Sequence, residues 1–374
     1  MLFILLISVA FAWYAQSFLF QKCWSKHLTV KLNFQDSYIY EGESSSLRET
    51  VINDKLLPLP ALCIRFAMSR HLVFRNEAIQ NSNISDQTYR NDVFSLLFHQ
   101  QITRNLPFVA KHRGYYSITE TTLTATDYFY SIDQLKTINQ DTGIYIFPAQ
   151  INTNCLNIIC RTISGMILTQ NRLHPDPFEF SGIREYRRED PMNRINWKAS
   201  ARTGNLMVNQ HDATTNIDLK ILFDLEDKYI IKYPELLEET IRIVSSLAAR
   251  LLSVKMPVTI IGNINHPITK TSFYEYLPAG GGKMMELNQK LAQIDVQQLA
   301  FSAVELLENE TQHTSGNYTY VFVSKNQQPE IIEQLRHLIS YGNQILWILP
   351  VTCHDENIHY NIPSLQLYQW EVTE

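Results

Sequence analysis

The residues best suited to polar chemistry form one dense run between Ser181 and Gly204. The run combines both signs of charge with two large aromatic side chains, and its members are Arg184, Glu185, Tyr186, Arg187, Arg188, Glu189, Asp190, Arg194, Trp197, Lys198 and Arg202. A solvated charge run does not need a tryptophan at its centre, and a buried strand tolerates ions only when they are paired. The mixture therefore indicates a surface where ion pairing and aromatic packing meet.

Two uses of this run follow from its chemistry. In the first, the ions pair with one another and with carbonyl groups, while Trp197 covers a seam between two structural units. Arginine suits such a joint because its guanidinium offers five donors in a fixed fork. This interpretation predicts that Trp197→Ala destabilises the protein by about 3–5 kcal/mol. In the second use, Arg187, Arg188 and Lys198 dock an acidic partner, and the two uses are compatible.

Composition limits the classes of function. The chain has 374 residues, of which 45% are hydrophobic and 18% charged, as in a globular protein. A net charge of -5 and a pI of about 6.1 argue against general nucleic-acid binding. The five cysteines form no CxxC pair, and His112, His211 and His354 are isolated in the sequence, so neither a zinc site nor a catalytic centre is predicted.

The segment from Met1 to Phe20 contains no charged side chain. About 20 apolar residues suffice to cross a bilayer as a helix. The segment lacks the basic start that a cleaved signal peptide would have. We therefore predict a transmembrane anchor over residues 1–21. Because Lys22, Lys26 and Lys31 follow, the positive-inside rule predicts a single-pass protein of the cell membrane with its bulk in the cytoplasm. A buried helix or a helix lying on the surface is the alternative.

The rest of the chain shows two different patterns. Residues 28–150 alternate over short stretches such as 29–34 and 115–120, which predicts an antiparallel β-sandwich. Residues 151–216 form a connecting segment that contains the charged run. In residues 217–374 continuous apolar strands alternate with helices, which predicts a parallel sheet covered on both faces. The predicted fold class is thus an α/β parallel-sheet domain preceded by a β-sandwich and a transmembrane helix.

Three sequence blocks carry a resemblance to a known family. They are GIREYRRED from Gly182, RINWKASAR from Arg194 and GNLMVNQ from Gly204, with RGYYSI from Arg113 and DYF from Asp127 as weaker matches upstream. This gapped pattern resembles the family known as Domain of Unknown Function 58. Many members of that family begin with two hydrophobic segments, whereas this chain shows one.

The resemblance implies both a fold and a set of partners. It implies that residues 217–374 are similar to a von Willebrand factor A domain in a bacterial or archaeal membrane protein. The implied partners are a MoxR-type AAA+ ATPase and a membrane protein with a transglutaminase-like domain. Within the motif, the residues expected to make the family's interactions are Arg184, Glu185, Tyr186, Asp190, Arg194, Trp197, Lys198 and Arg202.

The resemblance also implies a metal site at the end of the first strand of residues 217–374. Domains of the von Willebrand type usually carry Asp-x-Ser-x-Ser there, and carboxylate and hydroxyl oxygens suit Mg²⁺ or Ca²⁺. Here Asp224, Glu226 and Lys228 occupy those positions, and Lys325 follows Ser324 where an acid is expected. We therefore expect no cofactor; a weak Mg²⁺ or Ca²⁺ site at Asp224 and Glu226 is the alternative. Otherwise Asp224 caps the next segment or pairs with Lys228.

These features predict a membrane-anchored, non-enzymatic adaptor or chaperone-like protein that works with a MoxR-type AAA+ ATPase. Two alternatives stay open. One is a ligand-binding domain of the adhesion type that depends on a divalent metal. The other is a hydrolase or transferase whose site the sequence does not reveal.

Overall fold

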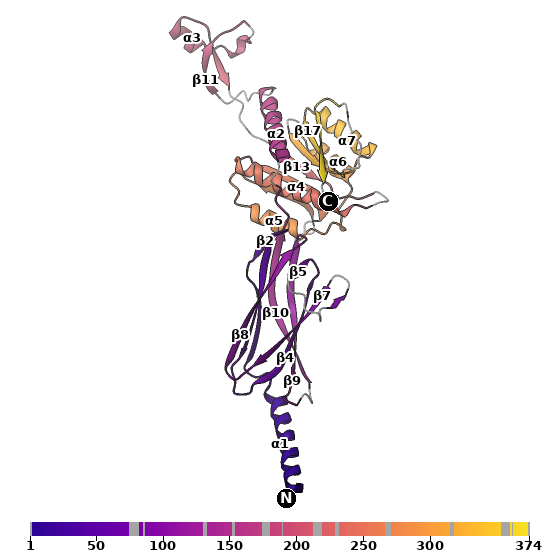
Figure 1. The fold of residues 1–374 in the computed structure, drawn as a ribbon. Helices are drawn as coiled ribbons and strands as arrows, with labels where there is room; N and C mark the ends of the chain where they lie inside the picture. The colour runs from indigo at the N-terminus through magenta and orange to yellow at the C-terminus, as the bar shows by residue number, and fades with distance from the viewer. Residues whose placement is uncertain are drawn as a thin grey trace. The chain divides into compact units, whose positions relative to one another are not determined.

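The chain divides into two compact units, the first of Met1–Ala149 with Leu291–Gln293 and the second of Gln150–Lys290 with Ile294–Glu374. Many of its elements are labelled in the ribbon of a computed structural model (Figure 1). The residues that the structure describes are 2–74, 82–84, 87–129, 133–151, 154–173, 180–188, 190–211, 219–228, 232–265, 271–314, 318–352, 360 and 362–372.

The first unit is a β-sandwich preceded by a helix. The helix α1 spans Leu2–Cys23, and the strands are β1 (Leu28–Phe34), β2 (Tyr38–Tyr40), β3 (Ser44–Asn53), β4 (Leu59–Ser69), β5 (Leu72–Phe74), β6 (Ser82–Ile84), β7 (Gln87–Leu96), β8 (Gln100–Ala110), β9 (Gly114–Thr126) and β10 (Asp133–Phe147). They form two sheets, ordered β1-β3-β8-β5 and β2-β10-β9-β4-β7-β6. Among the described strands of this unit only β2 and β10 pair in parallel, so the predicted antiparallel sandwich is present.

The predicted transmembrane anchor over residues 1–21 is wrong, and so is the single-pass membrane localisation that rested on it. None of the helices in the described part of the chain combines the length and the hydropathy that crossing a membrane requires. The last turns of α1 belong to the sandwich instead. Phe20 is 1% exposed in the core of the sandwich, and Ser17 Oγ donates to Asp127 Oδ2 over 3.3 Å.

The second unit contains one six-stranded mixed sheet. Its strands are β13 (Leu219–Phe223), β14 (Val258–Asn265), β15 (Ser272–Leu277), β16 (Thr319–Val323), β17 (Gln344–Thr352) and β18 (Leu365–Val372), in the order β15-β14-β13-β16-β17-β18. All neighbours are parallel except β14 and β15. The helices of this unit are α2 (Asn154–Leu173), α4 (Pro234–Ser253), α5 (Met284–Ala292), α6 (Ala303–His313) and α7 (Pro329–Ser340).

A small hairpin lies between α2 and β13 in the chain. It consists of β11 (Phe180–Glu185), the 3-10 helix η1 (Met192–Arg194), α3 (Trp197–Thr203) and β12 (Met207–His211), and we call it the hairpin module. Strands β11 and β12 pair antiparallel as a separate two-stranded sheet.

The predicted fold class is therefore wrong as a description of the whole chain. Besides the absence of a membrane-spanning helix in the described part, three of the four sheets are built mainly or wholly of antiparallel pairs, and parallel pairing dominates only the six-stranded sheet of the second unit. The prediction took the continuous apolar strands of residues 217–374 as the main feature of the fold. Most strand pairs of the described chain are instead antiparallel, a type of pairing that leaves one face of a sheet open to solvent.

The last residue of the central strand of the mixed sheet packs closely against its neighbouring strand. Phe223, the last residue of β13, packs its ring directly over Gly262 of β14, and a Cβ atom at Gly262 would collide with that ring. Strand β13 lies between two parallel neighbours, and its side chains are buried almost throughout. Asp224 directly follows β13 and therefore lies at the carboxyl edge of the sheet.

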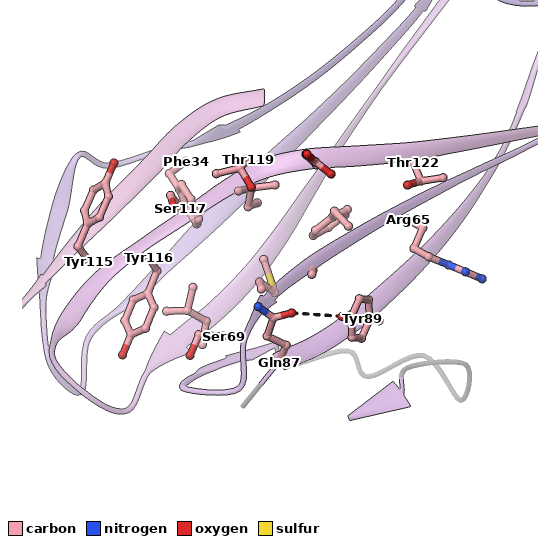
Figure 2. A pocket seen from close by; sticks show the side chains of 16 residues that line it. Phe34, Arg65, Ser69, Gln87, Tyr89, Tyr115, Tyr116, Ser117, Thr119 and Thr122 are labelled. Carbon is pink, nitrogen blue, oxygen red and sulfur yellow. Dashed lines mark hydrogen bonds between the residues drawn. The ribbon is translucent and has the colours of Figure 1, made fainter. Parts of the chain in front are cut away.

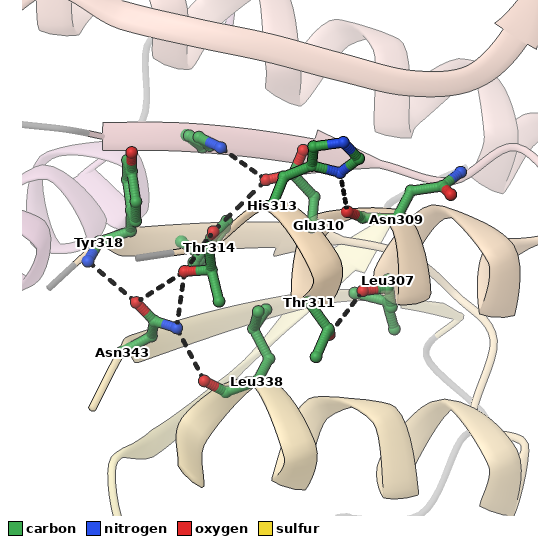
Figure 3. Close-up of polar contacts among 11 residues, drawn as sticks. Leu307, Asn309, Glu310, Thr311, His313, Thr314, Tyr318, Leu338 and Asn343 are labelled. Carbon is green, nitrogen blue, oxygen red and sulfur yellow. Dashed lines mark hydrogen bonds and ion pairs between the residues drawn. The ribbon is translucent and has the colours of Figure 1, made fainter. Parts of the chain in front are cut away.

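The opposite edge of the same sheet is tied to its helices by a polar cluster (Figure 3). Asn343 Oδ1 accepts from the N–H of Tyr318 over 2.9 Å, and Asn343 Nδ2 donates to the carbonyl of Leu338 over 2.8 Å. Lys220 of β13 meets Glu310 of α6 at 2.7 Å. Since these buried groups satisfy one another, we assign this cluster a structural role.

Candidate functional site

The carboxyl edge of the mixed sheet brings together the residues at which the sequence predicted a metal site. Asp224 follows β13, Ser324 follows β16, and Asn263 lies near the end of β14. In the sheet, β14 lies on one side of β13 and β16 lies on the other, so the chain continues in opposite directions from the centre. The gap between β13 and β16 is therefore a topological switch point. Ligands of open α/β sheets bind at such points.

Asp224 is completely buried, and protein donors occupy both of its carboxylate oxygens. Oδ1 accepts from the N–H of Glu226 at 2.8 Å and from Asn263 Nδ2 at 2.6 Å. Oδ2 accepts from Ser324 Oγ and from Asn326 Nδ2, each at 2.7 Å. Burial raises the pKa of Asp224 to about 6, even though the hydrogen bonds from Ser324, Glu226 and Asn326 act in the opposite direction.

Two lysines neutralise the remaining carboxylates at this edge. Lys228 Nζ lies 3.1 Å from Glu226 Oε1, and Lys325 Nζ lies 2.8 Å from Asp227 Oδ2. The other Glu226 oxygen accepts from the N–H of Ala303 at 3.0 Å. The suggestion that Lys228 pairs with Asp224 is therefore wrong, because its partner is Glu226, whereas Asp224 caps the following turn.

This donor set does not suit a divalent cation. The oxygens of Asp224 and Glu226 are taken up by amide, hydroxyl and ammonium donors, where a cation needs free oxygen ligands. In the part of the chain that the structure describes, no group of three or more histidine, cysteine, aspartate or glutamate residues could hold a metal ion. Sequence reasoning gave no role to Asn263 or Asn326, whose amides complete the network from strand ends far apart in the chain.

Of the three histidines considered from the sequence, the structure describes the side chain of His112 alone. His112 packs edge-on against His71, with their ring centroids 4.6 Å apart. His354 lies outside the described residues, as does the side chain of His211.

The hairpin module gathers the charged motif, and its internal polar groups are largely paired. Arg184 donates to both oxygens of Asp190, at 2.7 and 2.5 Å, and the N–H of Arg187 adds a third bond at 2.8 Å. These hydrogen bonds lower the pKa of Asp190 to about 2, and the bond from Arg184 makes the largest contribution. Asn196 caps α3 by accepting from the N–H of Ala199 at 3.0 Å, and Gly204 ends that helix in the left-handed conformation.

The aromatic and basic side chains of the module face solvent. Trp197 is 67% exposed, so the prediction that it covers a seam between two units, at a cost of about 3–5 kcal/mol on truncation, is wrong. The indole begins a short helix that buries none of its residues, because the two-stranded module has too small a core to cover it. Tyr186 is half-buried, and the side chains of Glu185, Arg187, Arg188, Lys198 and Arg202 are exposed.

A shallow depression on the module lies among these exposed groups. It has a volume of about 330 Å³ and is lined by Ile183, Asn196, Lys198, Ala199, Arg202, Thr203 and Met207. Its lining is mostly apolar, and Lys198 and Arg202 contribute positive charge to it. The side chain of Arg194 and the whole of Glu189 lie outside the described residues.

Comparisons with known proteins leave the family open. No protein-family model matches the sequence, and the search of curated proteins gives no match either. Among solved structures, a CARDB domain from Pyrococcus furiosus is 10% identical, with 31% of this chain and 90% of that chain covered, at a TM-score of 0.20.

Two further structures show likeness at the same low level. A non-cellulosomal cohesin from Archaeoglobus fulgidus is 8% identical over 32% of this chain and 91% of its own, at a TM-score of 0.22. A GH20 exo-β-N-acetylglucosaminidase from Vibrio harveyi is 9% identical over 92% of this chain and 79% of its own, at a TM-score of 0.23. Scores this low do not define the fold or the activity of this protein.

Proposed function

We propose that the protein is a non-enzymatic adaptor that binds another protein through its hairpin module. The observation that carries this proposal is the exposure of Trp197, at 67%, on a module in which Arg184 and Asp190 are bound to each other. A large indole in water costs free energy that burial against a partner recovers, and tryptophan and arginine are enriched among the residues that dominate binding.

The charge of the module indicates the chemistry of the partner. Residues 180–211 carry six arginine and lysine side chains and three carboxylates, whereas the whole chain has a net charge of -5. Complementary charge therefore favours an acidic surface, with carboxylates placed to meet Lys198 and Arg202. The mostly apolar depression that both cations help to line suits an aliphatic or aromatic side chain of the same partner.

The sequence resemblance supplies the first partner to test, a MoxR-type AAA+ ATPase. The saturated network around Asp224 supports binding in preference to metal-dependent or catalytic chemistry at the sheet edge. Its carboxylate oxygens already accept four hydrogen bonds, so the adaptor function is assigned to the hairpin module.

The test is a binding assay between the full chain and a MoxR-type ATPase, with and without nucleotide. We expect Lys198→Glu combined with Arg202→Glu to weaken binding at least tenfold and to reduce its salt dependence. Trp197→Ala should weaken it about thirtyfold, the effect of losing about 2 kcal/mol at a binding hot spot. Lys283→Glu and Tyr341→Ala alter exposed residues outside the module and serve as matched controls.

An ATPase that does not bind the wild-type chain would remove that partner from the proposal. Binding that survives all module variants but is lost in the controls would refute the hairpin module as the docking surface.

A further inference from the structure

One sheet of the sandwich splits along part of its length. Strand β4 pairs with β9 only between Ala61↔Thr126 and Phe66↔Thr121. Beyond Phe66, β4 continues to pair with β7, as far as Ser69↔Gln87. Beyond Thr121, β9 continues to pair with β10, as far as Gly114. The two strands therefore separate, and each keeps a neighbour on its outer side only.

The split holds a cleft of about 570 Å³, drawn in Figure 2. Met68 and Ile118 lie among its apolar lining and are almost fully buried, and Leu72 of the opposite sheet joins them. Hydroxyl-bearing side chains also line it, among them Ser69, Tyr89, Tyr115, Ser117 and Thr119 (Figure 2). One arginine and one glutamate, Arg65 and Glu120, also line the cleft, so it has no strong net charge.

An unpaired strand edge offers main-chain N–H and C=O groups in a row. Among the described residues, no side chain donates to or accepts from the main chain of residues 67–69 or 117–120. At the outer edge of β1, by comparison, a side chain pairs with the main-chain groups that have no neighbouring strand. There Gln140 Nε2 donates to the carbonyl of Val30 at 3.1 Å, and Gln140 Oε1 accepts from the N–H of Leu32 at 3.5 Å.

We propose that this split binds an extended peptide segment of another protein, which pairs with β9 as an added strand. Main-chain donors and acceptors at strand spacing are complementary to another extended main chain. The apolar floor and the hydroxyl-bearing walls suit a segment whose side chains alternate between apolar and small polar types. The near-neutral lining disfavours a phosphate-bearing ligand, so a peptide is the single occupant that this chemistry selects.

Thr119 provides a variant that removes one main-chain donor with little effect on the fold. It has no Cα partner on β10, because the register shifts between Asn139 and Thr142 opposite it. Proline is tolerated at such irregular positions of a strand. Thr119→Pro therefore removes one N–H from the part of β9 that has no β4 partner, and Thr119→Ala removes only the side chain and is the matched control.

The probe is a pool of end-blocked heptapeptides in which threonine alternates with valine, leucine, isoleucine or tyrosine. Amide hydrogen exchange of the full chain is followed with and without the pool. At ten times the Kd, exchange of the β9 amides that face the split should slow about elevenfold, by the factor 1 + [L]/Kd. The same pool methylated at every amide nitrogen has no main-chain donor along either edge and should give no slowing.

Strand addition would be established if the pool slows amide exchange of β9 in the wild type and in Thr119→Ala. The slowing should be lost in Thr119→Pro, and the methylated pool should not produce it. No slowing at millimolar peptide would overturn the proposal, as would equal slowing by the methylated pool. If exchange slows with protein concentration alone, a second copy of the chain fills the split and the proposed occupant is wrong. The methylated pool tests the wild-type chain, so the result does not depend on how well Thr119→Pro folds.

Discussion

Replacing Glu49 by glutamine should stabilise the sandwich, and by an amount that depends on pH. Glu49 lies on β3 with its side chain in the interior, and its exposed fraction is 0%. Neither of its carboxylate oxygens accepts a hydrogen bond. Nearby Asp92 is held by Arg90 at 2.6 Å and by Arg104 at 3.0 Å. Burial raises the pKa of Glu49 to about 8, the charge of Asp92 adds to this, and the two arginines act in the opposite direction.

The sign and size of the effect follow from this pKa. In the unfolded chain the carboxyl releases its proton above its ordinary value of 4.5, whereas the folded chain keeps it up to about 8. The folded state therefore binds more protons across this window, so the free energy of unfolding falls as pH rises through it and is constant above it. At about 1.4 kcal/mol for each pH unit, the penalty reaches about 3–5 kcal/mol at pH 9.

Glutamine carries no charge, so Glu49→Gln removes the penalty. We expect it to change the free energy of unfolding by less than about 1 kcal/mol at pH 5 and to raise it by about 3–5 kcal/mol at pH 9. Urea titration with pulsed amide exchange at β3 and β8 reports on the sandwich separately from the second unit. Asp141→Asn, at an exposed position of β10, is the control and should show no such gain. An equal gain at both pH values, or none at pH 9, would refute the assignment of a neutral buried carboxyl.

Three further predictions concern the second unit. Asp224→Ala leaves four donors aimed at the missing carboxylate, so it should lower the free energy of unfolding by about 3–5 kcal/mol, while Mg²⁺ or Ca²⁺ leaves the wild-type melting temperature unchanged. Trp197→Ala should change that free energy by less than about 0.5 kcal/mol in calorimetry, because the ring is exposed. Since the pKa of Asp190 is lowered to about 2, amide protection of the hairpin module should be lost as pH falls from about 4 towards 2. In the Asp190→Asn variant the amide protection of the hairpin module should already be low at pH 7.

Much of the secondary structure in the second unit could be predicted from local pattern. The run after Pro234 has apolar residues at helical spacing and forms α4, and the apolar run 344–350 forms β17. Such segments are predictable because their burial depends on their own periodicity. How strands from distant segments pair, and so how much of the chain is antiparallel, depends on contacts that no local window contains.

The exposure of a large side chain could not be predicted in the same way. Trp197 lies among ions in the sequence, and that neighbourhood alone is compatible with a seam or with a surface. The decision depends on whether another element covers α3, and in the structure this helix buries none of its residues. Glu49 presents the converse case. Alternation with Leu47 and Val51 places it inward, but its neighbour Asp92 comes from a strand of the other sheet.

Two buried carboxylates of this chain, Glu49 and Asp224, show why we assign function to its surface and not to the carboxyl edge of its mixed sheet. Glu49 accepts no hydrogen bond and has a pKa of about 8, whereas Asp224 accepts four and has a pKa of about 6. Hydrogen bonds from the protein thus offset part of the cost of burying Asp224, and in doing so they use the lone pairs that a metal or a substrate would need. By contrast, the indole of Trp197 is exposed and residues 117–120 of β9 have no β4 partner, and these are the groups that our two proposals assign to binding.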